Sequence, residues 1–212
     1  MNLDSFLASY SGSKPVAISV DIDETVFDNS AYQAWLIGKD FGYSSKTWGP
    51  WIASGQAKPM PGAVEFLNYA KDRGVEIFYI SNIKMAFYEG AEKKLKNLGI
   101  PFADKKHLLL RTETSDKQPR RDSVVKDYEI ALLLGDNLND FLSVFRKKPI
   151  DVRFAETDKI KDVGARSLSC FQIHSMAIGR GLYIKAIGAP AQQKKTRWEK
   201  TISSAGIIDR SQ

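Results

Sequence analysis

Two carboxylates stand two positions apart near the start of the chain. Asp21 and Asp23 come directly after the apolar run 16–20. In a parallel sheet that is buried on both faces, only the crevice beyond the strand ends is open to a ligand, so charge placed there is more often chemical than structural. A carboxylate can attack a phosphate monoester once a cation offsets the negative charges of both groups. The pair therefore indicates phosphoryl-transfer chemistry assisted by a metal ion.

Polar residues follow two later apolar runs in the same way. The run 75–80 leads into Ser81 and Asn82, and the run 130–134 leads into Asp136. If these runs are neighbouring parallel strands, their ends meet at one edge of the sheet. The hydroxyl and amide groups would then face the carboxylates, where they are candidates for binding phosphate oxygens.

Mg²⁺ is the cofactor that suits such a site. It prefers oxygen ligands in near-octahedral geometry, usually one or two carboxylates together with waters and substrate phosphate oxygens. Asp21 and Asp136 would supply the carboxylates, and the peptide oxygen of Asp23 would complete the protein's share. Asp21 could then act as the nucleophile and form an aspartyl-phosphate. Asp23 would protonate the departing alkoxide and later accept a proton from the attacking water.

Lys117 and Ser81 are candidates for stabilising the transferred group. Ser81 and nearby backbone N–H groups would hold phosphate oxygens, and Lys117 would place a positive charge over Asp21 and the transferring group. Each assignment has a structural alternative. Lys117 could be a solvated loop residue, Ser81 a turn residue, and Asp136 the cap of a helix that begins near Leu138.

Strands and helices alternate along the chain, which predicts a parallel α/β sheet flanked by helices with right-handed crossovers. A further short strand is expected at 107–110. Helices are indicated by apolar spacing and by proline and glycine punctuation. Their expected ranges are 61–74, 88–98, 119–128, 138–145 and 153–163.

An irregular, aromatic-rich segment, 29–58, interrupts this alternation after the first strand. We expect it to form a small cap over the crevice, inserted into a single domain that spans the chain. Tyr32, Trp48 and Trp51 are its candidates for substrate binding, through contact with the leaving group. Because Trp48 and Trp51 are three positions apart, the alternative is that they share a helical face and belong to the core.

The C-terminal region, 166–212, shows no clear periodicity beyond a short strand expected at 167–173. Its basic stretch, 194–200, leaves open a nucleic-acid-binding role, but such a run is more often solvated surface. Lys and Arg exceed Asp and Glu by 31 to 25, which gives a formal net charge of +6 and a pI near 9.2. This balance suits anionic ligands, and the expected partner is a small phosphorylated metabolite.

Composition is that of an ordinary globular protein, with 43% hydrophobic and 26% charged residues in a chain of 212. The single cysteine, Cys170, excludes an internal disulfide. No run approaches the roughly 18 apolar residues of a membrane span, and the first ten residues lack the features of a secretory signal. As the chain is written we expect a cytoplasmic protein, or a periplasmic or surface lipoprotein if an upstream signal is missing.

Taken together, these residues resemble the four motifs of the haloacid dehalogenase (HAD) superfamily of phosphatases. The matching motifs are Asp21-Ile-Asp-Glu-Thr25, Ser81-Asn82, Lys117 with Arg120-Arg121, and Gly135-Asp-Asn-Leu-Asn-Asp140. A narrower resemblance is to the class C acid phosphatases, which are bacterial 5′-nucleotidases related to lipoprotein e. It rests on the segments 28–32, 48–51, 61–66, 77–82 and 135–141.

This resemblance implies magnesium-dependent hydrolysis of phosphomonoesters, often nucleoside monophosphates, on a Rossmann-like core with a small cap. By motif match the nucleophile falls on Asp21 and the acid/base on Asp23. The metal ligands fall on Asp21, Asp23 and Asp136, with Asp140 at the acidic position that supports the metal. The family's lysine falls on Lys117. The phosphate-binding positions implied are Ser81, Asn82 and Lys117.

Two classes of function stay open on the sequence alone. The favoured class is a metal-dependent phosphatase. The second is a protein of the same fold that binds phosphate, nucleotide or nucleic acid without turnover. A calcium loop of the EF-hand kind is excluded, because Val26 and Tyr32 stand where that loop needs glycine and glutamate.

Overall fold

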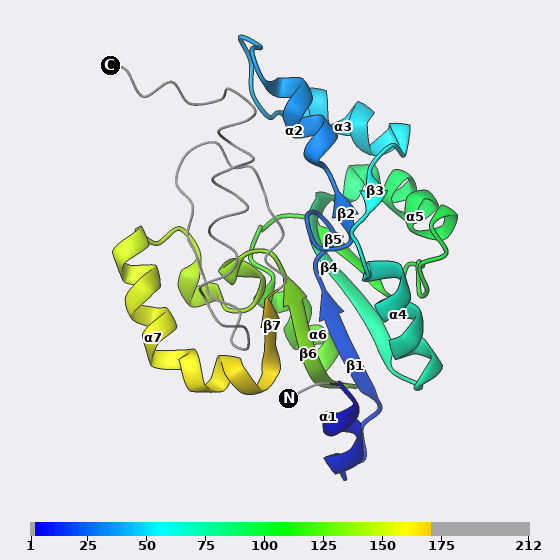
Figure 1. Ribbon diagram of the computed structural model, residues 1–212, viewed down its shortest axis with the longest axis vertical. Helices are drawn as coiled ribbons and strands as arrows, with labels where there is room; N and C mark the ends of the chain where they lie inside the picture. The colour runs from blue at the N-terminus through cyan, green and yellow to red at the C-terminus, as the bar shows by residue number, and fades with distance from the viewer. Residues whose placement is uncertain (1–2, 171–212) are drawn as a thin grey trace, which may run out of the picture. The chain divides into compact units, whose positions relative to one another are not determined.

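The computed structural model describes residues 3–170, with side chains described as far as residue 159. Its main sheet has five parallel strands in the order β5-β4-β1-β6-β7 (Figure 1). These strands are β1 (Val16–Val20), β4 (Glu76–Lys84), β5 (Leu108–Arg111), β6 (Glu129–Gly135) and β7 (Leu168–Cys170). The expected parallel α/β fold with flanking helices is confirmed.

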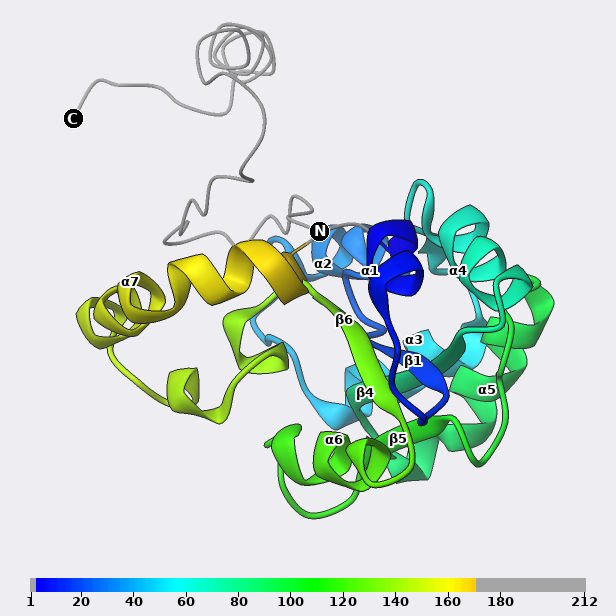
Figure 2. The ribbon, with the colours of Figure 1, turned by 90° about the horizontal axis from the view of Figure 1, so that it is seen from below.

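Helices cover both faces of this sheet, which explains why its strands are nearly continuous apolar runs. The helices outside the cap are α1 (Leu3–Ser9), α4 (Ala63–Asp72), α5 (Tyr88–Asn97), α6 (Gln118–Val125) and α7 (Ile150–Ser167). Successive side chains of a strand point to opposite faces. Ile18 accordingly belongs to the core under α1, α4 and α5, whereas Ala17 belongs to the core under α6. Figure 2 shows α6 on the opposite side of the sheet from α1 and α4.

The segment expected to form a cap, which we call the cap, lies between two very short strands. β2 (Phe27–Asp28) and β3 (Lys58–Pro59) pair antiparallel, and between them lie α2 (Ser30–Leu36) and α3 (Ser45–Ser54). A reciprocal capping box between Ser44 and Thr47 begins α3. Figure 1 shows the two helices beyond the carboxyl end of β1, where the sequence places Asp21 and Asp23.

A buried lysine of α5 holds the end of the cap. The Nζ atom of Lys94 donates to the backbone oxygens of Gly55, at 2.7 Å, and of Ala57. Gly55 is the left-handed residue that ends α3, so the ammonium satisfies carbonyl groups at a helix C-terminus. Burial lowers the pKa of Lys94, because the charged form loses solvation.

One predicted helix is wrong. The segment 138–145 forms two short 3₁₀ turns, η2 (Leu138–Asp140) and η3 (Ser143–Phe145), instead of one α-helix. A reciprocal capping box between Asn137 and Asp140 begins η2, and Leu142 then adopts an extended backbone that interrupts any helix. The capping role considered for Asp136 is therefore performed by Asn137.

Several boundaries also differ from expectation. β4 continues through Ser81 and Asn82 to Lys84, and a register irregularity between Ile80 and Lys84 accommodates these residues beside β5. The helix α1 has no counterpart in the prediction.

Residues 171–212 lie outside the described residues, so the basic stretch 194–200 and most of the region 166–212 are not tested. In the described part, none of the helices combines the length and the apolar character needed to cross a bilayer.

Candidate active site

The site lies at the carboxyl edge of the sheet, where β1, β4 and β6 end. The backbone N–H of Asp21 donates to the oxygen of Leu134 at 2.9 Å, so the residue after β1 is tied to the end of β6. The parallel register aligns Val20 with both Tyr79 of β4 and Leu134 of β6. This register brings the polar residues that follow the three strands to one edge.

Three carboxylates meet there. One oxygen atom each from Asp21, Asp136 and Asp140 lies within 4.8 Å of the others. The structure thus brings Asp21 and Asp136 together, although they are 115 positions apart in the chain (136 minus 21). Asp140 reaches the cluster through the turn η2, where its Oδ2 atom accepts the backbone N–H of Asn137 at 3.0 Å.

Lys117 lies among these carboxylates. Its Nζ atom is 2.5 Å from Oδ1 of Asp21 and 2.7 Å from Oδ1 of Asp140, and the residue is only 3% exposed. Burial disfavours the ammonium, but the two carboxylates outweigh burial and raise the pKa of Lys117. With three carboxylates and one ammonium ionised, the cluster carries a charge of −2, which one divalent cation would neutralise. The oxygen donors also suit a hard ion such as Mg²⁺.

Asp23 has a different environment from the other three carboxylates. Its Oδ1 atom accepts a hydrogen bond of 3.0 Å from Nδ2 of Asn29, and the side chain is not part of the three-carboxylate cluster. Burial and then the charge of Asp21 raise the pKa of Asp23 to about 7, although Asn29 acts in the opposite direction. Asp23 can therefore hold a proton near neutral pH, as an acid catalyst must.

Asp21 differs from Asp23 chiefly through Lys117. Burial raises the pKa of Asp21 to about 6, and the Lys117 ammonium, 2.5 Å away, keeps that rise smaller than burial alone would make it. The contact favours the ionised form, which is the form a nucleophile needs. The two carboxylates of the first motif thus have different neighbours, Lys117 beside Asp21 and Asn29 beside Asp23.

Glu24 was not among the predicted site residues. Burial, followed by the charges of Asp23 and Asp136, raises the pKa of Glu24 to about 8. Its φ angle of 58° lies in the left-handed region, which is uncommon for a residue with a side chain. Such backbone strain is concentrated at functional sites, where the surrounding structure holds it in place.

Ser81 and Asn82 are placed by an arginine from α6. Nη1 of Arg120 donates to the backbone oxygen of Ser81 at 2.5 Å, and Nη2 donates to Oδ1 of Asn82 at 2.9 Å. Nη1 also donates to the oxygen of Leu109 at 3.1 Å, so one guanidinium links the ends of β4 and β5. The Oγ atom of Ser81 accepts the N–H of Ile83, which leaves its own proton available to a phosphate oxygen.

The next arginine of α6, Arg121, contacts η2, whereas Arg120 contacts β4. Nη1 of Arg121 donates to the backbone oxygen of Asp140 at 2.5 Å, and Nη2 donates to Oε1 of Gln118 at 2.7 Å. Lys117 is the residue that precedes α6, so the two arginines hold its helix against β4 on one side and η2 on the other. The sequence marked these arginines only as motif members, because their contacts are made to distant backbone atoms.

The three predicted cap aromatics lie in unequal environments. Tyr32 and Trp48 are 2% and 6% exposed and contact each other edge to face, with ring centroids 4.9 Å apart. Trp51 is half-buried, and its Nε1 atom donates to Oδ1 of Asn29 at 2.8 Å. Trp51 therefore contacts the partner of Asp23. A role for any of the three in contacting substrate stays a prediction.

Comparison with known proteins gives the family. The family described as HAD superfamily, subfamily IIIB (acid phosphatase), matches residues 4–163. The solved structure of a class C acid phosphatase from Bacillus anthracis is 37% identical, covers 80% of this chain and 70% of its own, and has a TM-score of 0.75. Another structure of a class C acid phosphatase from that organism, with tungstate bound, is 30% identical, covers 99% of this chain and 86% of its own, and has a TM-score of 0.73. The chain therefore belongs to subfamily IIIB of the HAD superfamily, the acid phosphatases, and is a phosphomonoesterase.

Proposed function

We propose that this phosphatase is Mg²⁺-dependent, acts on small phosphorylated metabolites, nucleoside monophosphates among them, and works through an aspartyl-phosphate on Asp21. The observation that carries the proposal is the cluster of Asp21, Asp136 and Asp140 around Lys117. The solved relative with bound tungstate adds support, since tungstate is a tetrahedral oxyanion like phosphate.

The metal would be held by Asp21 and Asp136, with Asp140 behind them and the peptide oxygen of Asp23 beside them. When bound, it would offset the charge of the carboxylates and of the phosphate oxygens. The side chain of Asp23 is then left for proton transfer, in agreement with its hydrogen bond to Asn29 and its absence from the cluster.

The residues divide the reaction between them. Oδ of Asp21 attacks phosphorus while the bond to the leaving oxygen breaks, and Asp23 donates its proton to that oxygen. Asp23 then takes a proton from the water that attacks the phosphorus of the aspartyl-phosphate, which releases inorganic phosphate and restores Asp21. Lys117 and the Ser81 hydroxyl stabilise the charge on the equatorial oxygens during both steps.

The test is phosphate release from an aryl phosphate, with and without Mg²⁺. We expect activity that requires the ion and is abolished by Asp21→Asn, because an amide cannot attack phosphorus. Asp127→Asn, an exposed aspartate outside the site, is the matched control and should retain activity. Undiminished turnover by Asp21→Asn would exclude the covalent mechanism, and full activity in a chelator would exclude the metal.

A further inference from the structure

Two basic residues at the carboxyl edge of the sheet take no part in the reaction described above. Lys84 ends β4 and Arg111 ends β5, and the two are register partners on neighbouring parallel strands. Register partners project to the same side of a sheet, so their charges lie next to each other. This edge is the one that carries Ser81 and Asn82, only two or three positions before Lys84 in the chain.

We propose that Arg111 and Lys84 form a second anion-binding subsite, and that the preferred substrates are phosphomonoesters whose leaving group carries a further phosphate or carboxylate. The inference rests on the proposed function, because it assigns the substrate class of that same site. It differs from the phosphate site of Asp21, Lys117 and Ser81, since it would bind the group that departs.

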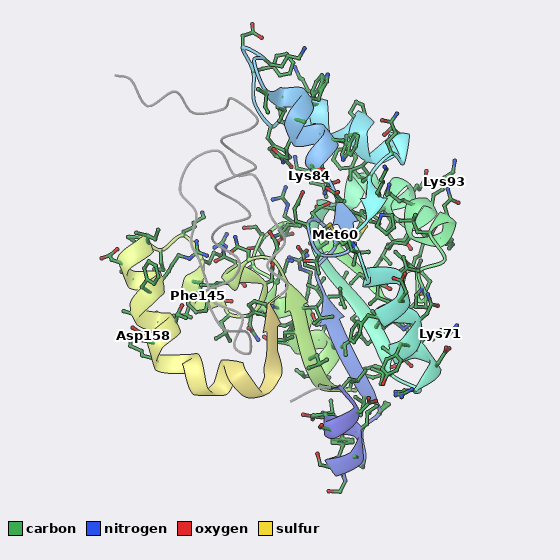
Figure 3. The ribbon with its side chains drawn as sticks, viewed as in Figure 1. Met60, Lys71, Lys84, Lys93, Phe145 and Asp158 are labelled. Atoms are coloured by element: carbon green, nitrogen blue, oxygen red, sulfur yellow. The ribbon has the colours of Figure 1, made fainter. Side chains whose placement is uncertain are left out.

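The cap shows on which side of the reaction centre this pair lies. Nζ of Lys84 donates to Oγ of Ser45, at the start of α3, at 2.7 Å, and Figure 3 shows Lys84 at the base of the cap. Tyr43, also in the cap, is 62% exposed. Burial raises the pKa of Tyr43, the charge of Arg111 lowers it, and the charge of Asp23 raises it, so the phenol lies near both charged groups.

The position of Tyr43 near both Arg111 and Asp23 indicates which part of the substrate the two basic residues would bind, namely the leaving group. In the proposed reaction Asp23 hands a proton to the departing oxygen, and Asn29 and Trp51 join Asp23 to the cap, so the remainder of the leaving group would extend toward the cap. Lys84 contacts Ser45 of the cap, and the charges of Arg111 and Asp23 both act on the phenol of Tyr43, which favours a place for the two basic residues beside that space.

The two cations are available for a ligand. Among residues 3–159, neither Arg111 nor Lys84 forms an ion pair with a carboxylate. Arg111 is half-buried and close enough to Arg120 to disfavour the charge of that guanidinium, so positive charge accumulates at this edge. Partly buried charges are screened less by salt than exposed ones. A guanidinium also matches the two oxygens of a carboxylate or phosphate in geometry.

The experiment compares substrates of equal shape and different charge. Carboxyphenyl phosphate and carbamoylphenyl phosphate, in their 3- and 4-isomers, differ by one negative charge on the leaving group. For the wild-type protein with Mg²⁺ we expect kcat/KM to favour the carboxylate by about tenfold or more in at least one isomer pair, and this preference to fall as salt is added. A ratio near one in both pairs would overturn the inference.

Variants assign the preference to the two residues. Arg111→Gln and Lys84→Gln should each lower the ratio several-fold, whereas Arg111→Lys should retain much of it because the charge remains. Lys71→Gln is the control for the change in net charge, since Lys71 is exposed and lies on α4 away from the cap in Figure 3. An unchanged ratio in Arg111→Gln and Lys84→Gln, with unfolding temperatures like that of the wild type, would also overturn the inference.

A binding measurement separates this inference from the proposed function. Titration of the same substrates into the Asp21→Asn variant by calorimetry reports affinity without turnover. If carboxyphenyl phosphate binds about tenfold more tightly than its amide but the wild-type protein hydrolyses neither, the subsite stands and the proposed reaction fails. If both are hydrolysed with equal efficiency and bind equally, the reaction stands and the subsite fails.

Discussion

The amide of Asn29 donates a hydrogen bond of 3.0 Å to Oδ1 of Asp23. Asn29 is fully buried, and its own oxygen accepts the indole N–H of Trp51 in α3. A residue of the cap is thereby linked through one amide to the proposed acid catalyst. The link stabilises the ionised form of Asp23, and it follows that the cap influences when Asp23 holds its proton.

Asn29→Ala should move the pH dependence of the reaction. Loss of the donor raises the pKa of Asp23 further, so the protonated form persists to higher pH. For an alkyl phosphate, whose leaving oxygen needs a proton, we expect the alkaline limb of the kcat profile to shift upward. The unpaired indole N–H should also cost about 1–3 kcal/mol of unfolding free energy. Asn68→Ala, which removes a contact to the backbone of α4, should leave the limb in place.

Lys117→Met should distinguish two effects of the ammonium, its neutralisation of the buried carboxylates and its contribution to the rate of the reaction. Removal of the ammonium leaves Asp21 and Asp140 unpaired in a buried site, which typically costs about 3–5 kcal/mol. Loss of a donor to the transferring group should reduce kcat by about 10²–10³-fold. Saturating Mg²⁺ should restore much of the stability and little of the activity, because the ion neutralises the carboxylates without replacing the donor.

Lys94→Met is the matched control for Lys117→Met. Lys94 is also buried, but it donates to backbone carbonyls at the end of the cap and contacts no carboxylate of the cluster. We expect a loss of stability that Mg²⁺ does not selectively reverse. Thermal unfolding of both variants, with and without the ion, makes the comparison. Equal recovery in the two variants would contradict the placement of Lys117 within the metal site.

Stability of the metal-free protein should fall as pH rises. Burial raises the pKa of Asp23 to about 7 and that of Glu24 to about 8. Because these values exceed those of the unfolded chain, near 4, the folded state binds more protons between about pH 4 and pH 8. The contribution to stability is therefore complete below pH 4 and is lost as pH rises through the folded-state values.

Thermal unfolding in a chelator at pH 5 and pH 8 measures this dependence. We expect the unfolding temperature to be lower at pH 8, and Mg²⁺ to raise it more at pH 8 than at pH 5, since protons compete with the ion for carboxylates. Glu24→Gln removes one titrating group and should flatten the dependence. An unchanged slope in that variant would argue against the burial of Glu24 as a cause.

Arg120→Lys should impair turnover through position alone. A lysine retains the charge but cannot reach the backbone oxygens of Ser81 and Leu109 and the Asn82 side chain at once. A displaced phosphate site can cost up to about 10²-fold in rate. Steady-state kcat and the unfolding temperature should both be measured, with Arg73→Lys, an exposed arginine paired with Asp4, as the control. Wild-type kcat in Arg120→Lys would contradict the positioning role.

Much of the site could be located from the sequence because parallel strands impose a simple rule. Residues that follow parallel strands lie at the carboxyl edge of the sheet. Asp21, Ser81 and Asp136 could therefore be placed together without knowledge of any side-chain contact. The residues that were missed lack such a rule. An asparagine side chain is not a catalytic acid, base or nucleophile. The importance of Asn29 depends on two contacts, one to Asp23 and one to Trp51, which is 22 positions away in the chain.

The error at 138–145 has a local cause. Apolar residues at helical spacing predicted one helix, and the same spacing is compatible with two tight turns. The Asp140 carboxylate accepts the N–H of Asn137 and caps the start of the first turn, and the extended backbone of Leu142 then prevents the turn from continuing as an α-helix. The oxygen not used in that contact points to Lys117. The backbone at Leu142 has here overridden the periodic signal on which the prediction relied.

The pairing of β2 with β3 bears on how far the sequence of the cap can change. Register partners Phe27 with Pro59 and Asp28 with Lys58 bring both ends of the cap to one narrow stem. Exchanges within the cap that keep Asn29 and Trp51 can therefore be accommodated without altering the spacing between β1 and β4. Changes of cap sequence that keep this stem and the contacts of Asn29 would leave the carboxylates at the strand ends in place.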